Sequence, residues 1–157
     1  MSFFYGEYYT TMDDKGRFAL PAKLRNVLGP DNQPLLEGNL ILTKGLEGCL
    51  VLYTDSEWQA VRNRFSTISF ARKDYRFFSR RFYRMACQVV PDRSGRILIP
   101  STLIKVADLK KELIVMGQDR WIEIWNPQHY QKYDEEYPAS YEDVAERLFT
   151  PDGDYQE

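Results

Sequence analysis

Two short segments of this chain each place an aspartate four residues before an arginine, a spacing that suits binding chemistry. The first segment spans residues 13–17 and the second spans residues 92–96. A guanidinium group presents a planar fork of N–H donors that fits carboxylates, phosphates and the edge of guanine. A carboxylate four residues earlier can hold that fork in position by a charge-assisted hydrogen bond. Arg17 and Arg96 are therefore candidate binding residues, with Asp13 and Asp92 as their partners.

The same two pairs also have a simpler interpretation. Exposed Asp–Arg pairs are common, and each contributes only about 0–1 kcal/mol to stability. Asp13–Arg17 and Asp92–Arg96 could thus do no more than fix their turns. The residues alone leave both interpretations open.

Both pairs belong to a repeated string that predicts local structure. Each copy consists of Asp-x-x-Gly-Arg, three apolar residues and Pro, and the copies begin 79 residues apart, at Asp13 and Asp92. Asp favours a turn, Gly permits a positive φ, and Pro fits the first turn of a helix. Each copy therefore predicts a strand, a tight turn that carries an Arg, a second strand and a helix start. Two matched corners predict a paired binding surface.

Alternating apolar residues and turn residues extend the repeat. Expected strands are residues 7–12, 17–20, 40–43 and 49–53 in the first copy, and 87–90, 113–116 and 121–125 in the second. The short helix after the first Pro is expected to bury a stripe of Leu24, Val27 and Leu28. The closing strand pair repeats at an offset of 72, which predicts a seven-residue insertion in the 29–39 loop of the first copy. The chain is an internal duplication.

The segment between the copies predicts two amphipathic helices, over residues 55–68 and 72–84. Apolar residues recur at helical spacing, with Trp58, Val61 and Phe65 on the first helix. The second helix carries many basic residues: Arg72, Lys73, Arg76, Arg80, Arg81 and Arg84. These cations can pair with acidic groups of a neighbouring subunit or contact phosphates, and the sequence leaves this choice open.

Charge is distributed unevenly along the chain. The formal net charge is −2, but residues 1–130 carry 19 Lys and Arg against 14 Asp and Glu, whereas residues 131–157 carry 2 against 9. A basic body suits nucleic acid, and a short acidic segment predicts a loosely held appendage.

Catalysis and cofactor binding have little support in the sequence. His129 is the only histidine, and neither a nucleotide-binding loop nor a metal-ligand spacing is present. We therefore expect no enzyme activity and no cofactor. Cys49 and Cys87 are expected to be buried thiols of a reduced, cytoplasmic protein. The sequence contains no run of about 18 apolar residues, so it predicts no membrane span.

These observations predict an α+β fold, mainly β, in which two copies pack as an intramolecular pseudo-dimer because one copy is too small to bury a core alone. Its expected parts are a first repeat (5–53), a helical connector (54–84), a second repeat (85–126) and a C-terminal helix with an acidic tail (127–157).

Duplicated Asp-x-x-x-Arg turns, each followed by a short apolar strand and Pro, resemble the MraZ family, which is built from two AbrB-like (SpoVT–AbrB) repeats. Further segments that resemble this family are residues 5–8, 46–53, 95–100 and 117–118, and Glu123-Ile124-Trp125. The resemblance covers about residues 3 to 135.

The resemblance implies tandem swapped-hairpin repeats and a ring-shaped homo-oligomer. It implies a nucleoid-associated transcription regulator that binds promoter DNA of the bacterial cell-division and cell-wall gene cluster. Arg17 and Arg96 would contact bases, with Asp13 and Asp92 as the matching acids. Lys15 and Arg93, which occupy different positions in their turns, would contact phosphates. Neighbouring subunits would then bind direct repeats in the promoter.

An alternative from another functional class is an antitoxin-type protein-binding module. In such a protein, the acidic, aromatic tail would engage a protein partner. Antitoxins of that type carry one repeat per chain, whereas this chain carries both. The neighbouring gene, a toxin or a cell-wall methyltransferase, would discriminate between the two.

Overall fold

The computed structural model describes residues 3–150, which fall into two compact units, one ending at Pro127 and one beginning at Gln128. The first unit contains the strands β1 (Glu7–Thr11), β2 (Arg17–Ala19), β3 (Leu40–Lys44), β4 (Leu50–Tyr53), β5 (Cys87–Val89), β6 (Arg96–Leu98), β7 (Glu112–Gln118) and β8 (Trp121–Trp125), and the helices α1 (Ala22–Arg25), α2 (Asp55–Ser66), α3 (Lys73–Met85) and α4 (Ser101–Val106). The second unit consists of α5 (Pro127–Glu136), whose first residue ends the first unit, and α6 (Tyr141–Phe149).

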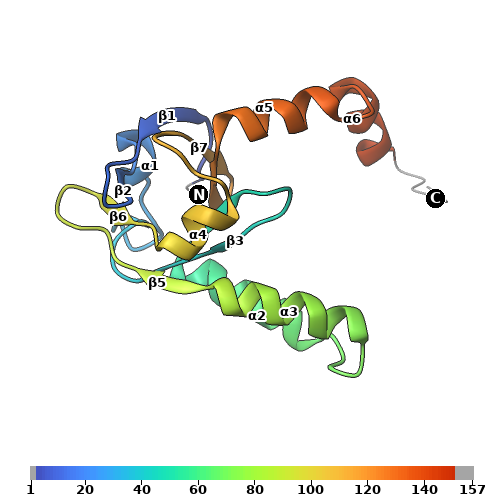
Figure 1. Cartoon of the computed structure of the whole chain (residues 1–157). Coiled ribbons are helices and arrows are strands. Elements are labelled where there is room, and N and C mark those ends of the chain that lie inside the picture. The colour runs from blue at the N-terminus through green and yellow to red at the C-terminus, as the bar shows by residue number, and fades with distance from the viewer. Residues whose placement is uncertain (1–2, 151–157) are drawn as a thin grey trace. The chain divides into compact units, whose positions relative to one another are not determined.

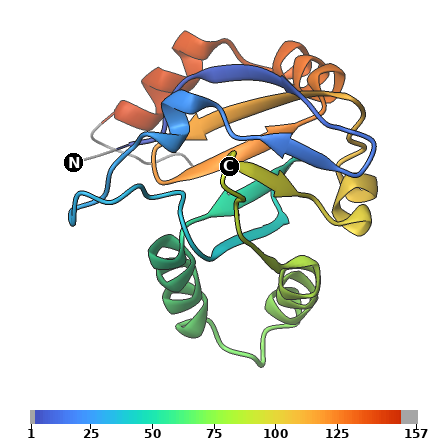
Figure 2. The same ribbon diagram turned by 90° about the vertical axis from the view of Figure 1, so that its left-hand side faces the viewer.

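Six strands form one antiparallel sheet in the order β1-β7-β8-β4-β3-β5, and β2 pairs with β6 in a separate two-stranded ribbon. Replacing each element by its counterpart in the other repeat reverses the strand order and leaves the sheet unchanged. A local twofold axis therefore relates the two repeats. The predicted α+β pseudo-dimer is confirmed (Figures 1 and 2).

The strand register follows this symmetry. In the ribbon, Phe18 lies opposite Ile97, its own counterpart 79 residues later. In the large sheet, Val51 lies opposite Glu123, its counterpart at an offset of 72. In each of these central pairings, one strand comes from the first repeat and the other from the second. One repeat alone therefore could not bury its apolar strands.

One prediction about the repeat offset is wrong. The register of β3 with β4 and of β7 with β8 gives an offset of 73 for β3 to β7 and 72 for β4 to β8. The first copy thus has six extra residues in its 29–39 loop and one extra residue in the hairpin turn after Lys44. In that turn, Glu47 and Gly48 both have positive φ, at 58° and 97°. One extra residue within a strand would move the following side chains to the other face, because the side-chain period of a strand is two. The turn accommodates the extra residue instead, so the strand faces stay aligned.

A single apolar core joins both repeats. One face of the large sheet, the inner faces of β2 and β6, and α1 and α4 contribute side chains to it, among them Phe18, Leu24, Leu52, Ile97 and Leu103, each at most 2% exposed. Cys49 is fully buried, as predicted, and Cys87 is half-buried. The expected stripe on α1 is only partly correct. The helix ends at the cap Asn26, so Leu28 lies beyond it and is 37% exposed.

Helices α2 and α3 form a hairpin on the opposite face of the sheet. The Thr43 hydroxyl donates to the Phe82 carbonyl at 2.9 Å, and Trp58 stacks on Phe82 with ring centroids 5.5 Å apart. Figures 1 and 2 show this hairpin extending away from the β2/β6 ribbon. The predicted bounds of both helices differ from the observed ones by one or two residues.

The C-terminal segment forms more regular structure than expected. Instead of a loose tail after one helix, it contains a second helix, α6, whose first turn is capped by the Ser140 hydroxyl accepting from the Asp143 amide at 3.1 Å. Residues 151–157, which hold the last three acids of the expected tail, lie outside the described residues.

Candidate nucleic-acid interface

The β2/β6 ribbon brings the two predicted arginines to one surface. Arg17 lies opposite Leu98, and Arg96 lies opposite Ala19. These four side chains point to the same face, because alternate residues of a strand share a face. Phe18 and Ile97, between them in sequence, face the core. The two arginines are diagonal neighbours across the ribbon, a relation that places the two residues about 7–8 Å apart and their Cβ atoms somewhat closer.

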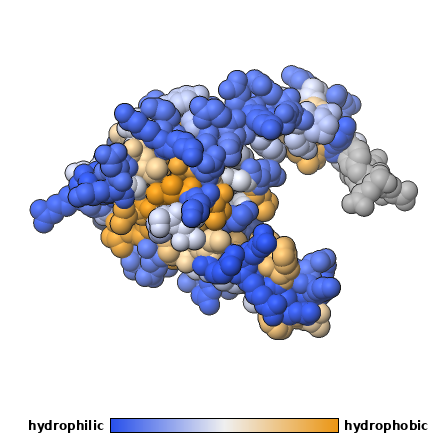
Figure 3. Space-filling view, in the orientation of Figure 1, coloured by the Kyte–Doolittle hydropathy of each residue, from blue (hydrophilic) through white to orange (hydrophobic). Residues whose placement is uncertain are grey.

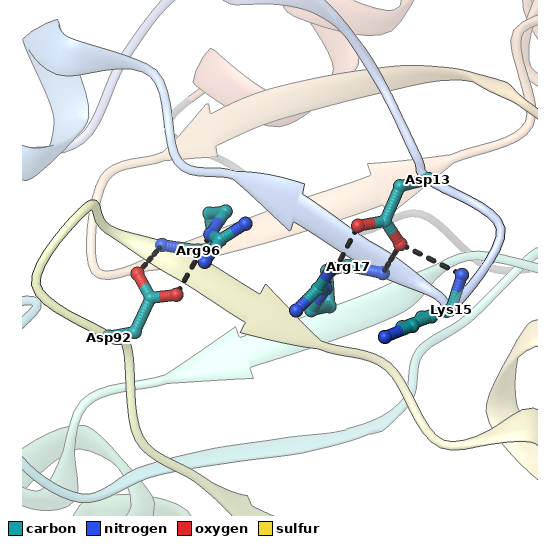
Figure 4. Close-up of polar contacts among 5 residues, drawn as sticks. All are labelled: Asp13, Lys15, Arg17, Asp92 and Arg96. Carbon is teal, nitrogen blue, oxygen red and sulfur yellow. Dashed lines mark hydrogen bonds and ion pairs between the residues drawn. The ribbon is translucent and has the colours of Figure 1, made fainter.

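The first turn is organised by the carboxylate of Asp13. Its Oδ1 accepts from the backbone amides of Lys15 and Arg17, both at 2.9 Å, and its Oδ2 accepts from Nε of Arg17 at 2.9 Å. Gly16 has a φ of 85°, a conformation that glycine adopts at little cost. One carboxylate thus both closes the turn and orients the arginine (Figure 4).

The second turn repeats this geometry. Asp92 Oδ1 accepts from the amides of Ser94 and Arg96, both at 2.9 Å, while its Oδ2 accepts from Nε of Arg96 at 2.8 Å. Gly95 has a φ of 74°. The turns differ in sequence at their second and third positions and still agree closely, because the bonds that define them come from Asp, Gly and the backbone.

Each turn is also joined to the other repeat. The Gly95 carbonyl accepts from the Leu20 amide at 2.9 Å, and the Gly16 carbonyl accepts from the Ile99 amide at 2.8 Å. The two arginine corners therefore belong to one hydrogen-bonded unit rather than to two independent loops.

The hydrogen bonds of the two guanidinium groups leave their outer edges available. Among residues 3–150, Arg17 and Arg96 donate side-chain bonds only through Nε. Their terminal Nη1 and Nη2 groups are thus available to a ligand. The two arginine side chains are 34% and 44% exposed. An arginine that is held through Nε keeps the edge formed by Nη1 and Nη2, and this edge can donate two parallel hydrogen bonds to guanine or phosphate.

The aspartates remain charged in this setting. The pKa of Asp13 lies below its usual range, chiefly because its carboxylate accepts the Arg17 backbone amide and also because it accepts the Arg17 side chain. The pKa of Asp92 is lowered in the same way by Arg96. Hydrogen bonds to a carboxylate favour its ionised form, so each turn keeps its ion pair at neutral pH.

The two other predicted site residues lie on the rims of the turns. Lys15 and Arg93 are exposed, and Lys15 contributes only its backbone amide to the turn. Their charged ends neither shape the turns nor meet the arginine pairs through a hydrogen bond in the described part of the chain.

One basic residue at this surface is not predicted by the repeated string. Arg25, on α1 of the first repeat, packs against Gly95 of the second turn so closely that a Cβ on Gly95 would lie 2.2 Å from its Nε. Its counterpart beside Gly16 is Ile104. The second corner thus gathers Arg25, Arg93 and Arg96, and the first does not have this extra charge. The repeat alignment places Arg25 opposite an apolar residue, and this asymmetry was the available signal.

Within residues 3–150, no cluster of three or more His, Cys, Asp or Glu side chains could hold a metal ion. In the same part of the chain, no helix is both long and apolar enough to cross a membrane.

The fold and the paired turns define a class of protein: two AbrB-like repeats in one chain, packed as a pseudo-dimer around a shared ribbon. Comparisons with known proteins make this assignment specific. The model of a family described as "MraZ protein, putative antitoxin-like" matches residues 3–81 and 82–152.

Similar proteins from several bacteria extend over nearly the whole chain. The transcriptional regulator MraZ of Cytophaga hutchinsonii is 38% identical over 151 residues, which cover 96% of this chain and 97% of that protein. The protein of the same name from Heliobacterium modesticaldum is 39% identical over 145 residues, with 92% and 96% covered, and that from Lactiplantibacillus plantarum is 34% identical over 145 residues, with 92% and 97% covered. The chain belongs to the MraZ family.

Proposed function

We propose that this protein is a transcriptional regulator that binds double-stranded DNA sequence-specifically through the β2/β6 ribbon. A two-stranded ribbon fits the major groove of B-DNA, where the terminal nitrogens of Arg17 and Arg96 can donate together to O6 and N7 of guanine. The observation that carries the proposal is the pair of Nε–aspartate bonds, which aim both guanidinium edges outward from one rigid face. Arginines that served only to fix their turns would not need this shared outward orientation.

Side chains around the ribbon have different roles in binding. Asp13 and Asp92 position the arginines. Lys15 and Arg93 contact phosphates, and these contacts raise the affinity for DNA without selecting a sequence. The repeats (5–53 and 85–126) supply one corner each. The connector (54–84) and the C-terminal segment (127–157) serve assembly.

The active form is a ring-shaped homo-oligomer that binds direct repeats in the promoter of the cell-division and cell-wall gene cluster, in the cytoplasm and at the nucleoid. One ribbon is a small footprint, because specific protein–DNA interfaces usually bury about 1,000 Å² or more of protein surface. Several ribbons presented by one assembly meet that requirement.

Selection of bound sequences from a random DNA pool tests the function directly. The proposal predicts enrichment of a short guanine-containing box that recurs in the same orientation. If the selected pool remains random, or its members differ only in length, the protein does not bind DNA sequence-specifically.

A second candidate function, an antitoxin-type protein-binding module, is favoured by one observation. Helix α6 is amphipathic, and Tyr141, Leu148 and Phe149 on it are 85%, 74% and 83% exposed. The description of the matching family also includes the words "putative antitoxin-like". This candidate predicts a stable complex with the product of a neighbouring gene that survives Arg17→Ala and is lost when α6 is removed.

A further inference from the structure

The outward face of α3 is basic and aromatic. Five residues share this face at helical spacing: Lys73, Phe77, Arg80, Arg81 and Arg84. Together with Arg76 they line a hollow of about 450 Å³. None of the salt bridges among residues 3–150 involves these cations, so no acidic side chain of the described chain forms an ion pair with them.

Exposed rings lie among these cations. Phe77 is 61% exposed, and the Arg81 guanidinium lies over its ring at 4.8 Å from the centroid. Phe70, just before the helix, is 66% exposed. Figure 3 shows hydrophobic patches between hydrophilic side chains over the helical hairpin. A phosphate backbone would neutralise the arginines and leave the rings in water, whereas an acidic, apolar protein segment would satisfy both.

Helix α6 has the complementary character. Its apolar stripe consists of Tyr141, Val144, Ala145 and Leu148, at positions i, i+3, i+4 and i+7, with Phe149 beside it. Along one edge of this stripe lie Glu142 and Glu146, which are four residues, about one turn, apart. The helix carries three acids and one base, whereas α3 carries five bases and one acid.

We propose that α6 of one chain docks on the basic, aromatic face of α3 in a second copy of this chain. The apolar stripe of α6 then covers Phe77, while Glu142 and Glu146 pair with arginines beside that ring. The two surfaces are different from one another and complementary, and both are present on every chain. This is the requirement for a head-to-tail contact, which closes into a ring when its rotation permits. The inference rests on the proposed assembly and identifies the contact that builds it.

DNA is the competing occupant of the α3 face. The α2/α3 hairpin extends away from the β2/β6 ribbon (Figures 1 and 2), so one duplex lying on the ribbon would not reach along the hairpin. An intramolecular contact of α6 is the other alternative, and it would leave the mass of the particle unchanged.

Charge reversal in complementary pairs tests the contact without DNA. One variant carries Arg80→Glu and Arg81→Glu, and the other carries Glu142→Arg and Glu146→Arg. Light scattering after size exclusion should show each variant alone with a mass near the 18.5 kDa of one chain, whereas the wild type forms a larger particle. An equimolar mixture should recover the larger particle, because each subunit then meets an oppositely charged partner on both sides. A chain with all four changes should recover it as well.

Arg62→Glu with Lys111→Glu provides the matched control. It has the same charge change on exposed residues off the α3 face, and it should remain assembled. Circular dichroism establishes that each variant is folded. If one of the two reversal variants does not fold, the chain with all four changes tests the contact in its place.

Each other outcome overturns the inference in a recognisable way. A monomeric wild type removes the assembly itself. An assembled wild type with reversal variants of unchanged mass leaves the assembly standing and removes this contact. If both reversal variants are monomeric and their mixture does not reassemble, α6 of one chain does not pair with α3 of another, and this contact is removed. If Arg80→Glu with Arg81→Glu weakens DNA binding at unchanged mass, the α3 face binds phosphate instead. None of these masses depends on whether Arg17 and Arg96 contact bases, so the DNA proposal is tested separately.

Discussion

At the scale of single residues, each aspartate of the paired turns has two tasks that use different oxygens. Oδ1 of Asp13 accepts two backbone amides and shapes the turn, while Oδ2 accepts Nε of Arg17 and aims the side chain. An arginine aimed in advance loses less side-chain entropy on binding than a mobile one. Under the proposed function, we therefore expect the aspartates to raise DNA affinity without touching DNA.

The lowered pKa values of Asp13 and Asp92 predict how pH affects the turns. A carboxyl group whose folded pKa lies below its unfolded value stabilises the fold above the unfolded pKa, about 3.8–3.9, and loses that contribution as pH falls through the folded pKa. Asp13→Asn with Asp92→Asn should thus lower the thermal midpoint at pH 6–7 but not at the lowest pH that preserves the fold. Scanning calorimetry checks this, and a difference that grows toward acid would contradict it.

Burial of a thiol gives a second prediction at this scale. Burial raises the pKa of Cys49 to about 12, so almost no reactive thiolate forms near pH 8. In a Cys87→Ser background, iodoacetamide should modify the native chain far more slowly than the urea-unfolded chain. Mass spectrometry measures both rates, and equal rates would mean that Cys49 is accessible.

Residues governed by local rules could be predicted from the sequence, whereas those governed by tertiary contacts could not. Asp13, Gly16 and Arg17 form their turn through neighbours within four residues, so the string itself indicates the geometry. Arg25 reaches Gly95 across the twofold axis, 70 residues away in sequence, and no periodicity indicates that contact. The role of these residues in DNA binding stays a prediction.

At the scale of elements, the ribbon depends on the two side chains that meet at its twofold axis. Phe18 and Ile97 are 1% and 0% exposed, and they fasten the ribbon to the core. Ile97→Ala should lower the free energy of unfolding by about 2–5 kcal/mol, because it removes packed methyl groups and leaves a cavity. Leu98→Ala, one residue away on the outer face and 56% exposed, should change it by no more than about 0.5 kcal/mol. Urea unfolding compares the two, and similar losses would show that the ribbon is not anchored by its inner face.

Element prediction succeeded where apolar periodicity was strong and failed where composition dominated. The helical spacing of Trp58, Val61 and Phe65 predicted a helix, and the structure has α2 at this place. Helix α6 was missed because its acidic and aromatic composition indicated an appendage, although Ser140 followed three residues later by Asp143 is a helix-start pattern. The six-residue and one-residue insertions could be separated only from the strand register.

At the scale of the whole molecule, the proposed ring makes a geometric prediction about its operator. Ribbons on neighbouring subunits that face one side of the duplex require boxes spaced near one helical turn, about 10–10.5 bp. Inserting about 5 bp between two boxes should rotate the second box to the far side and abolish cooperative binding, whereas inserting about 10 bp should restore much of it. Gel-shift titration measures the cooperativity. Equal binding to all three spacings would rule out this arrangement.

The affinity of arginine variants for selected and scrambled DNA tests directly whether Arg17 and Arg96 contact bases. Arg17→Ala and Arg96→Ala should each lower specific affinity by about 1–3 kcal/mol and relax the preference for guanine. Their thermal midpoints should change little, because both side chains are partly exposed.

Lys15→Ala with Arg93→Ala is the control for this measurement. It should weaken binding to both DNAs alike and reduce the slope of log K against log salt by about 1.8, or about 0.9 for each lost phosphate contact. Fluorescence anisotropy at several salt concentrations gives both quantities. We expect the Arg17→Ala, Arg96→Ala double variant to bind selected and scrambled DNA equally. A double variant that keeps the wild-type affinity and the wild-type preference would show that Arg17 and Arg96 do not read the DNA sequence.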